Sequence, residues 1–575
     1  MTKRGGTVIR AGLLLLLLAC VSADALSQAE NVPAHHPVYA FLKRMETKGI
    51  IEGYHDAVLP LSRREVAGFL TEAEEKREEL TGAYSDYLDE FLSEFQLEVT
   101  GSTAGFHRLI DSGEPSLGGA AAEAFSDREK FIYFAADSSA NIFINFLMDL
   151  EARRITGDDL GSAHSEYLQF GGRVRGTLWG KLGYYAELTN AQFWGSRDLL
   201  KRDPLISQSH ALGVTNAQNF DFAESYLRFD AEVVSAQIGR ERLLWGYGAY
   251  EQMTLQDTVR TYDFLRAEAS YKKYLRYTFM HAWILGRADQ VSFQLPFDST
   301  EVYTENVNAD KYFAAHRLEL SWPSVLDFGA QEMVIYSNRS PDLAYLNPLA
   351  FIEPVQRSRG ERDNVFWAFD LQFHMIPNVQ LHGSIVYDDI HLTNLFSNRW
   401  EDRYAWQAGI LYSDPFTIPN VDLMVEYTRV EPYVYSHARS REGSYTSLDR
   451  LLGPQIGPNA DSWFLRADWV PLRNLWLSAS VVFERKGQNE LSAEGYLQRN
   501  VGGSEWMPHR STDPVTKEFL DGIRQNTRRI WLSASWEIVN QIWLDLRYQY
   551  DEREDLTVGE KSKNQTYFGR LRTVF

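Results

Sequence analysis

The sequence predicts an all-β transmembrane barrel of about 18 antiparallel strands, preceded by a small α-helical region on the periplasmic side. Three observations predict this fold. From about residue 129, apolar and polar residues alternate with a period of two over stretches of about ten residues, the length of a tilted barrel strand. Short turns and long polar connections alternate along the same region. Beyond the N-terminus no stretch offers about 20 consecutive apolar residues, so a closed barrel is the spanning structure that remains.

Residues 1–25 have the features of a secretory signal peptide. Three basic residues come first, the apolar run 13–18 is too short to cross a bilayer, and the Ala-Asp-Ala of 23–25 fits a cleavage site. The single cysteine, Cys20, follows a small residue, so acylation is one alternative and loss with the cleaved peptide is the other. After cleavage the chain has no cysteine for a disulfide or a thiolate metal site.

Residues 26–128 are expected to form a helical periplasmic region followed by a linker rich in Gly, Ala and Ser. Apolar residues at i, i+3, i+4 and i+7 over 38–45 predict an amphipathic helix. Residues 48–70 weakly resemble one S-layer homology repeat, a family that binds cell-wall polymers. A capping box formed by Ser62 and Glu65 explains the same residues without that role. A peptidoglycan tether therefore stays an alternative function for this region.

Residues 129–575 carry the barrel pattern. Leu544 and Leu546 share one face of their strand, whereas Asp545 and Arg547 take the other. Tight turns are predicted at 376–378, 418–420, 471–474 and 538–541, and long polar connections at about 193–222, 287–311, 338–363, 432–460 and 487–527. Short turns on one side and long loops on the other are typical of bacterial outer-membrane barrels, so the outer membrane is the expected location.

The last strand has a special requirement. Tyr567, Leu571 and Phe575 line one face of it, and the chain ends on an aromatic ring. A terminal strand of this kind resembles the signal that delivers barrels to the barrel-insertion machinery. The strand must also pair with the first one, because an open edge in lipid leaves backbone groups without partners.

Composition excludes several function classes. The formal net charge of -20 argues against wrapping nucleic acid, which needs clustered Lys and Arg. The sequence has no P-loop, no nucleophile elbow and no zinc-binding spacing of Cys and His, so no catalytic residue, cofactor or metal is predicted.

Two segments carry the candidate binding residues. Residues 239–257 are dense in Gly, Trp and Tyr, and rings exposed there would stack on sugar faces. Residues 332–364 combine Pro turns, aromatic residues and an Arg cluster suited to the carboxylates or phosphates of an anionic polymer. The candidates are Trp245, Tyr247, Tyr250, Tyr345, Asn347, Arg357, Arg359 and Arg362. The alternative is that both segments pack into the barrel and constrict it.

The same segments resemble the capsule-assembly Wzi family. The stretch "LLWGYGAYEQMTLQD" is similar to that family's W-G-P-G stretch, with Tyr247 where Pro is usual, and "HRLELSW" through "YLNPLAF" is similar to its next block. The resemblance covers most of residues 220–365. It implies an outer-membrane barrel with a helical periplasmic part that binds capsular polysaccharide and helps to hold it at the cell surface.

The favoured function is therefore non-enzymatic: binding of capsular or extracellular polysaccharide in support of its assembly or attachment, by a barrel surrounded by outer-membrane lipid. A porin-like solute channel is the second hypothesis. The lumen-facing charges of Arg466, Asp468, Asp545 and Arg547 suit a wet pore.

Overall fold

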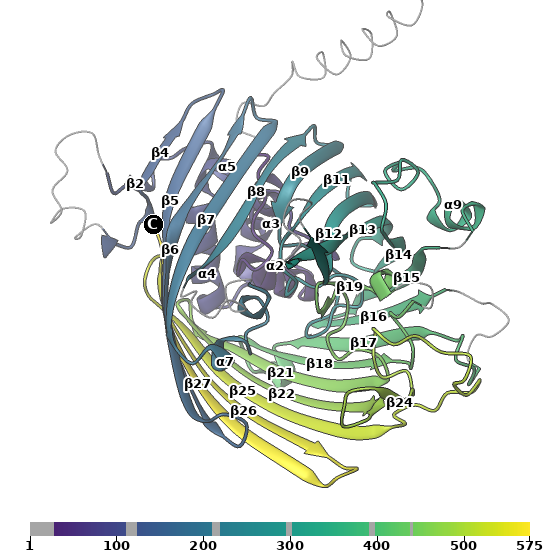
Figure 1. Cartoon of the computed structure of the whole chain (residues 1–575). Coiled ribbons are helices and arrows are strands. Elements are labelled where there is room, and N and C mark those ends of the chain that lie inside the picture. Colours follow the sequence, from purple (N-terminus) through teal and green to yellow (C-terminus); the bar gives the residue numbers. More distant parts are fainter. Residues whose placement is uncertain are drawn as a thin grey trace, which may run out of the picture.

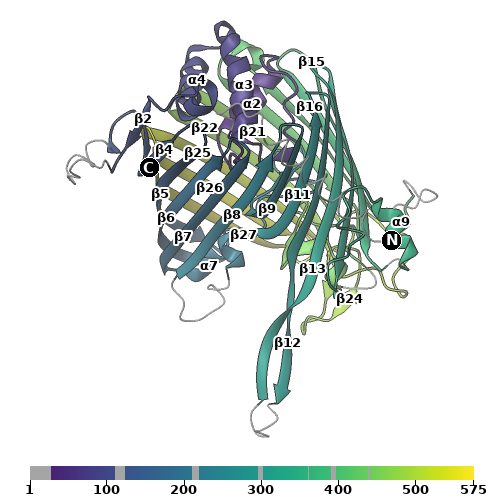
Figure 2. The ribbon, with the colours of Figure 1, turned by 90° about the horizontal axis from the view of Figure 1, so that it is seen from above.

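A computed structural model describes residues 28–110, 124–209, 219–294, 302–360, 362–389, 397–437 and 441–575. Eighteen long antiparallel strands close into a barrel (Figure 1), and the N-terminal helices lie at one end of it (Figure 2). The predicted signal peptide and Cys20 lie outside the described residues. Among the helices of the described ranges, none has the length and apolarity needed to cross a membrane.

Each long strand pairs with its neighbours in chain order. The strands are β5 (Asn141–Gly157), β6 (Gly161–Leu178), β7 (Leu182–Gly195), β8 (Asn219–Asp230), β9 (Val234–Glu241), β11 (Tyr262–Tyr271), β12 (Leu275–Gln294), β13 (Val302–Trp322), β14 (Leu326–Ser337), β15 (Asn364–Ile376), β16 (Val379–Asp388), β17 (Tyr404–Ser413), β18 (Val421–Val430), β21 (Ala460–Leu472), β22 (Leu475–Gln488), β25 (Ile523–Val539), β26 (Ile542–Asp555) and β27 (Glu560–Val574). The prediction of about 18 strands is confirmed.

The last strand closes the barrel on the first. β27 pairs with β5, for example through Leu571 and Leu150. The N–H of Phe575 donates to the carbonyl oxygen of Phe146 at 2.9 Å, and the N–H of Phe146 donates back at 2.6 Å. The C-terminal residue thus contributes two hydrogen bonds to the closing seam, where unpaired backbone would be costly in lipid.

The period-two pattern sorts side chains between lipid and lumen. Outward side chains stay exposed on the isolated chain: Leu546 is 50% exposed and Tyr567 is 48% exposed. Phe568, the neighbour of Tyr567, points inward and lines an internal cavity. The predicted alternation is therefore confirmed, with the apolar face on the outside of the barrel.

One predicted connection is wrong. Residues 287–311 were expected to be a long polar loop, yet β12 runs to Gln294 and β13 begins at Val302. The two strands continue to pair beyond a register shift between Leu285 and Ala288. Their hairpin extends past the rest of that end of the barrel (Figure 2). Polar composition suggested a loop here because a strand outside the membrane needs no apolar face.

The N-terminal domain is a small helical unit. Its elements are α2 (Val38–Thr47), β1 (Val58–Leu59), α3 (Arg63–Glu75), the 3-10 turn η1 (Arg77–Glu79), α4 (Gly82–Glu94) and α5 (Gln96–Thr100). The predicted capping box is present: the Ser62 side chain accepts from the N–H of Glu65, and the Glu65 carboxylate accepts from the N–H of Ser62. Phe41, Leu42 and Leu88 pack in a core of their own.

This domain covers the end of the barrel that carries the short turns (Figure 2). Arg44 of α2 is 2% exposed and forms ion pairs with Asp414 and Asp422 beside the turn between β17 and β18. Glu65 of α3 pairs with Arg276 at the start of β12. Burial alone would raise the pKa of the Glu65 carboxyl, but Arg276 and other nearby guanidinium groups lower it to about 2.

Further short elements complete the chain. They are β2 (Phe106–Arg108), β3 (Glu129–Phe131), β4 (Tyr133–Ala136), α7 (Arg197–Leu200), η2 (Ile206–Gln208), β10 (Leu244–Trp245), α9 (Ile352–Ser358), η4 (Pro415–Thr417), η5 (Arg441–Gly443), β19 (Thr446–Ser447), β20 (Arg450–Leu451), β23 (Glu490–Leu491) and β24 (Leu497–Arg499). β2 lies within the expected linker and pairs in parallel with β3.

Candidate functional site

The segment that follows β9 turns into the lumen. Its strand β10 pairs with β1 of the N-terminal domain, where Trp245 lies opposite Val58. Trp245 is 0% exposed and Tyr247 is 6% exposed. The expectation that these rings are exposed for stacking is therefore wrong, and the alternative that the segment packs inside the barrel is correct. The indole ring of Trp245 belongs to a core that also contains Leu255 and Tyr435.

A buried carboxylate holds this segment in place. Glu426 of β18 accepts hydrogen bonds from the N–H groups of Ala249, Tyr250 and Glu251 at 2.6, 3.1 and 3.2 Å. The Tyr250 ring stacks on Phe464 at 4.9 Å between ring centroids. Hydrogen bonds from three N–H groups to one carboxylate are strong in the low dielectric of the barrel interior. They therefore hold this segment in its inward position.

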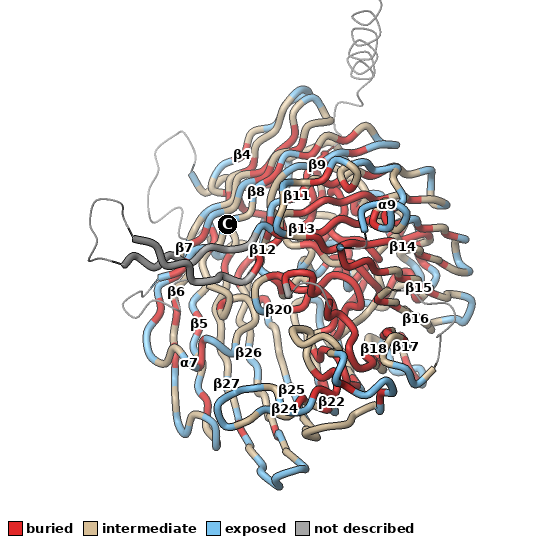
Figure 3. Tube along the Cα trace, turned by 45° about the vertical axis from the view of Figure 1, so that its right-hand side comes forward, coloured by how far each residue is buried: buried red, intermediate tan, exposed pale blue. Residues whose placement is uncertain are grey.

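A second connection fills the same side of the lumen. Between β18 and β21 the chain folds inward, and Val434, Tyr435 and Tyr445 are buried. The Tyr445 hydroxyl donates to the carbonyl oxygen of Thr254 at 2.7 Å, which joins the two inward segments. Buried residues concentrate on this side of the molecule (Figure 3). The lumen beside β11 to β18 is thus occupied by the chain itself.

The other candidate segment lies elsewhere. Residues 339–360, named here the outer strap, pack on the outside of the wall formed by β12 to β15. Tyr345 is 0% exposed, and its hydroxyl donates to Asp363 at 2.8 Å. Asn347 is exposed, and its side-chain oxygen accepts from the N–H of Leu349 at 3.1 Å.

Three arginines belong to the strap and its return to β15. Arg357, Arg359 and Arg362 are all exposed, and the first two pair with Glu353 and Asp342. The wall of the barrel separates them from Trp245 and its neighbours. The two predicted groups of residues therefore do not form one site.

One open part of the lumen is an arginine-lined cavity of about 650 Å³. Its walls come from β5 to β9, β26 and β27, and among the described residues nine arginines and seven carboxylates line it. The lining also includes residues 203–206, in the long connection after β7, and His35 of the N-terminal domain. In a chain with a net charge of -20, this surface has a local excess of positive charge.

Most of these arginines are held by carboxylates. Arg173 pairs with Glu187 at 2.8 Å, and Arg242 pairs with Glu224 at 2.8 Å. Arg547 differs, because it forms no ion pair within 4.0 Å with any residue that the structure describes. Its guanidinium carbon lies 5.4 Å from the ring centroid of Phe568, and its side chain is exposed to the cavity.

Arg260 likewise lines the cavity and is exposed, without an ion pair to the described part of the chain. Arg547 and Arg260 therefore have guanidinium groups available to an anionic ligand. Phe568, which is half-buried, supplies aromatic surface beside the charged groups. This combination of donors and an aromatic ring suits a sugar that carries a carboxylate or phosphate.

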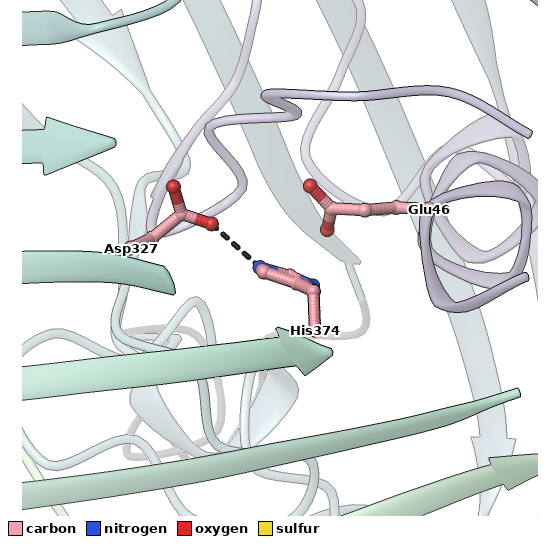
Figure 4. Close-up of side chains that lie close together, drawn as sticks. All are labelled: Glu46, Asp327 and His374. Atoms are coloured by element: carbon pink, nitrogen blue, oxygen red, sulfur yellow. Dashed lines mark hydrogen bonds and ion pairs between the residues drawn. The ribbon is translucent and has the colours of Figure 1, made fainter. Parts of the chain in front are cut away.

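A cluster of possible metal ligands joins the N-terminal domain to the barrel: Glu46, Asp327 and His374 (Figure 4). His374 Nε2 lies 2.7 Å from Asp327 Oδ2. The Glu46 carboxylate accepts from the side-chain amides of Gln372 and Gln380 at 3.1 Å each. Burial raises the pKa of Glu46, so a proton can neutralise this group. We interpret the cluster as a docking contact of α2.

Comparison with known proteins places the barrel in a family. The sequence profile of the capsule assembly protein Wzi matches residues 152–566. The chain belongs to the Wzi family. The match spans every barrel strand from β6 to β26 completely. No curated protein sequence matches the chain.

One solved structure shares the fold of this Wzi-family chain, and others are less similar. An Escherichia coli protein is similar with a TM-score of 0.54 and 11% identity, over 95% of this chain and 99% of that one. It is Wzi, described as a carbohydrate-binding β-barrel of the outer membrane involved in group 1 capsule assembly. Pseudomonas aeruginosa OpdQ has a TM-score of 0.41 and 9% identity, over 76% and 98% of the two chains. A BenF-like porin from Pseudomonas fluorescens Pf-5 has a TM-score of 0.43 and 9% identity, over 75% and 99%.

The arginine-lined cavity is the feature that the candidate residues missed. Its members come from strands far apart in the sequence, such as Arg153 in β5 and Arg570 in β27. The period-two pattern of β26 did predict that Arg547 faces the lumen. This was the signal in the sequence that could have indicated the cavity. Arg466 and Asp468 also point inward, where they pair with each other at 2.7 Å.

Proposed function

We propose that this Wzi-family barrel acts without catalysis in the outer membrane, where it binds surface polysaccharide and supports capsule or exopolysaccharide assembly or attachment. Family membership over residues 152–566 is the observation that carries the proposal. The carbohydrate binding described for the similar Escherichia coli barrel supports it. The long connections would face the cell exterior, and the helical domain the periplasm.

The arginine-lined cavity is the saccharide site that the geometry favours. Its volume of about 650 Å³ lies within the range of small-molecule sites. Arg547 and Arg260 would bind carboxylates or phosphates of the sugar, and Phe568 would stack on a ring face. The predicted role of Trp245 becomes indirect, because its ring supports the inward segment. Arg357, Arg359 and Arg362 remain exposed candidates on the other side of the wall.

The infilled lumen favours binding over transport. The N-terminal domain covers the short-turn end, and two inward segments occupy the side lined by β11 to β18. We therefore expect purified protein in planar bilayers to show little steady conductance. A stable, large conductance would instead favour the porin-like channel. The peptidoglycan tether stays a prediction, and retention of the full chain on isolated cell wall tests it.

The decisive experiment measures attached and shed polysaccharide in a strain that lacks the gene, complemented with variants. We expect Arg547→Gln to increase shedding, because it removes an unpaired guanidinium from the cavity. Arg528→Gln is the matched control, since Arg528 lies on the neighbouring strand β25 and faces outward. Unchanged attachment in the strain without the gene would refute the function. Unchanged attachment with Arg547→Gln alone would refute the cavity as the site.

A further inference from the structure

The outer strap covers part of the outer face of the barrel wall. Outward side chains under it are buried, whereas an outward side chain beyond it is exposed. In β14, Met333 and Ile335 point inward, so Val334 and Tyr336, which alternate with them, point outward. Val334 is nevertheless 0% exposed and Tyr336 1% exposed. Leu371, an outward residue of β15 beyond the strap, is 45% exposed. The strap and its helix α9 lie outside the ring of strands (Figure 1).

The backbone of the strap is irregular, but many of its N–H groups have hydrogen-bond partners within the protein. The N–H groups of Ile352 and Glu353, at the start of α9, donate to the outward carboxylate of Glu332 at 2.8 and 2.6 Å. The N–H of Tyr345 donates to the carbonyl oxygen of Asp342 at 3.0 Å. Irregular backbone at membrane depth requires partners of this kind, because lipid tails supply none. The strap is thus built for an environment poor in water.

The exposed surface of the strap has two parts. The part formed by residues 343–351 carries apolar side chains, and the part that returns to β15 carries arginines. Leu343 and Leu349 are each 83% exposed, and Phe351 is 72% exposed. The strap descends along the wall, since the Tyr277 hydroxyl near the start of β12 donates to the carbonyl oxygen of Pro348. Exposed apolar side chains on the outer wall of a barrel match acyl chains better than water.

The arginines lie toward the long-loop end, because β15 begins there. The side chain of Arg357 is 65% exposed and that of Arg359 is 47% exposed, although both have carboxylate partners. The partner of Arg359, Asp342, is 5% exposed, and Asp363 of the same region is 3% exposed. Glu353, the partner of Arg357, is 26% exposed, so each of these guanidinium groups is more exposed than its carboxylate partner. Guanidinium groups bind phosphate with two parallel hydrogen bonds.

We infer that the outer strap binds a phosphate-bearing lipid of the outer leaflet. The acyl chains lie against Leu343, Leu349 and Phe351, and the phosphate lies against Arg357 and Arg362. This arrangement has apolar contacts toward the middle of the bilayer and positive charge at its outer edge, as such a lipid requires. It also explains why a connection in an outer-membrane barrel folds down over the wall instead of extending outward.

A site-specific probe tests the lipid contact in the full chain. Cys20 is the only cysteine, so with Cys20→Ser each of Leu349→Cys and Tyr496→Cys offers one labelling site. Tyr496 is 75% exposed in the connection that contains β23 and β24 at the long-loop end, and it serves as the matched control. In nanodiscs with brominated lipid, we expect strong quenching of the fluorophore at 349 and weak quenching at 496. Equal quenching at the two positions would overturn the inference.

Lipid retention tests the phosphate contact. Barrels extracted with their native lipids are analysed by native mass spectrometry, and lipid A is the phosphorylated lipid offered in add-back. We expect Arg357→Gln with Arg362→Gln to lose most bound lipid A, whereas Arg528→Gln retains it. Equal retention would overturn the inference. The inference would also fail if the probe at 349 were quenched in nanodiscs that hold one barrel but not in nanodiscs that hold two. In that case a second copy of the chain would cover the strap.

Discussion

Replacement of Arg44 tests how the N-terminal domain is fastened to the barrel. Arg44→Met keeps an unbranched apolar stem but removes the charge, and with it the contact in which the guanidinium carbon lies 4.4 Å from the Tyr84 ring centroid. Asp414 keeps Lys48 as a partner at 2.6 Å, so Asp422, 15% exposed, loses its only ion pair among the described residues. Loss of one member of a buried ion pair costs about 3–5 kcal/mol. Because Asp414 keeps Lys48 and Asp422 is partly exposed, we expect a loss of about 3 kcal/mol in the free energy that docks the domain.

Hydrogen exchange of the α2 amides in the full-length barrel measures this change. If the domain undocks as a unit, about 3 kcal/mol corresponds to roughly 100-fold faster exchange. Arg77→Met is the control in the same domain, because Arg77 pairs with exposed Glu74 and Asp89, and we expect less than about 1 kcal/mol there. Asp422→Asn should restore part of the protection lost in Arg44→Met. Equal exchange in the two arginine variants, or no rescue, would refute the reasoning.

Three further predictions concern docking, packing and closure. The pKa of Glu65, about 2, lies below its unfolded value, so its stabilisation is full above about pH 4.3 and is lost as the pH falls toward 2. Because Glu65 is 29% exposed, we expect its ionised form to contribute about 1–2 kcal/mol to stability. Melting curves should show that Glu65→Gln removes this acid dependence. Protection of the N-terminal domain from hydrogen exchange at pH 7 should also fall. Trp245→Ala should lower the free energy of unfolding by about 3–5 kcal/mol in denaturant titrations, whereas unchanged stability would contradict the burial of this ring. Deletion of Phe575 should reduce the fraction of heat-modifiable, folded barrel in membranes, since it removes both hydrogen bonds to Phe146, whereas Leu556→Ala in the β26–β27 turn should not.

The sequence by itself determined the architecture of this protein. A period of two is a local property, so the outward position of Leu546 and the inward position of Arg547 could be read from neighbouring residues. The capping box of Ser62 and Glu65 is equally local and was predictable. The strand count followed from the same pattern repeated along the chain. The resemblance to the Wzi family rested on contiguous stretches, and the profile match over residues 152–566 confirmed it.

Only the tertiary structure decided where the connections go. Residues 239–257 and the outer strap have similar polar and aromatic compositions, yet one enters the lumen and the other lies on the outer wall. The carboxylates that hold them, Glu426 and Glu332, come from different strands, and their partners are backbone N–H groups that carry no sequence signal. The cavity likewise depends on strands more than 400 residues apart in the chain being neighbours across the closing seam, as Asn564 and Gly157 are. Composition can show that arginines and rings are present, but which side of a wall they face depends on long-range hydrogen bonds that form only when the barrel closes.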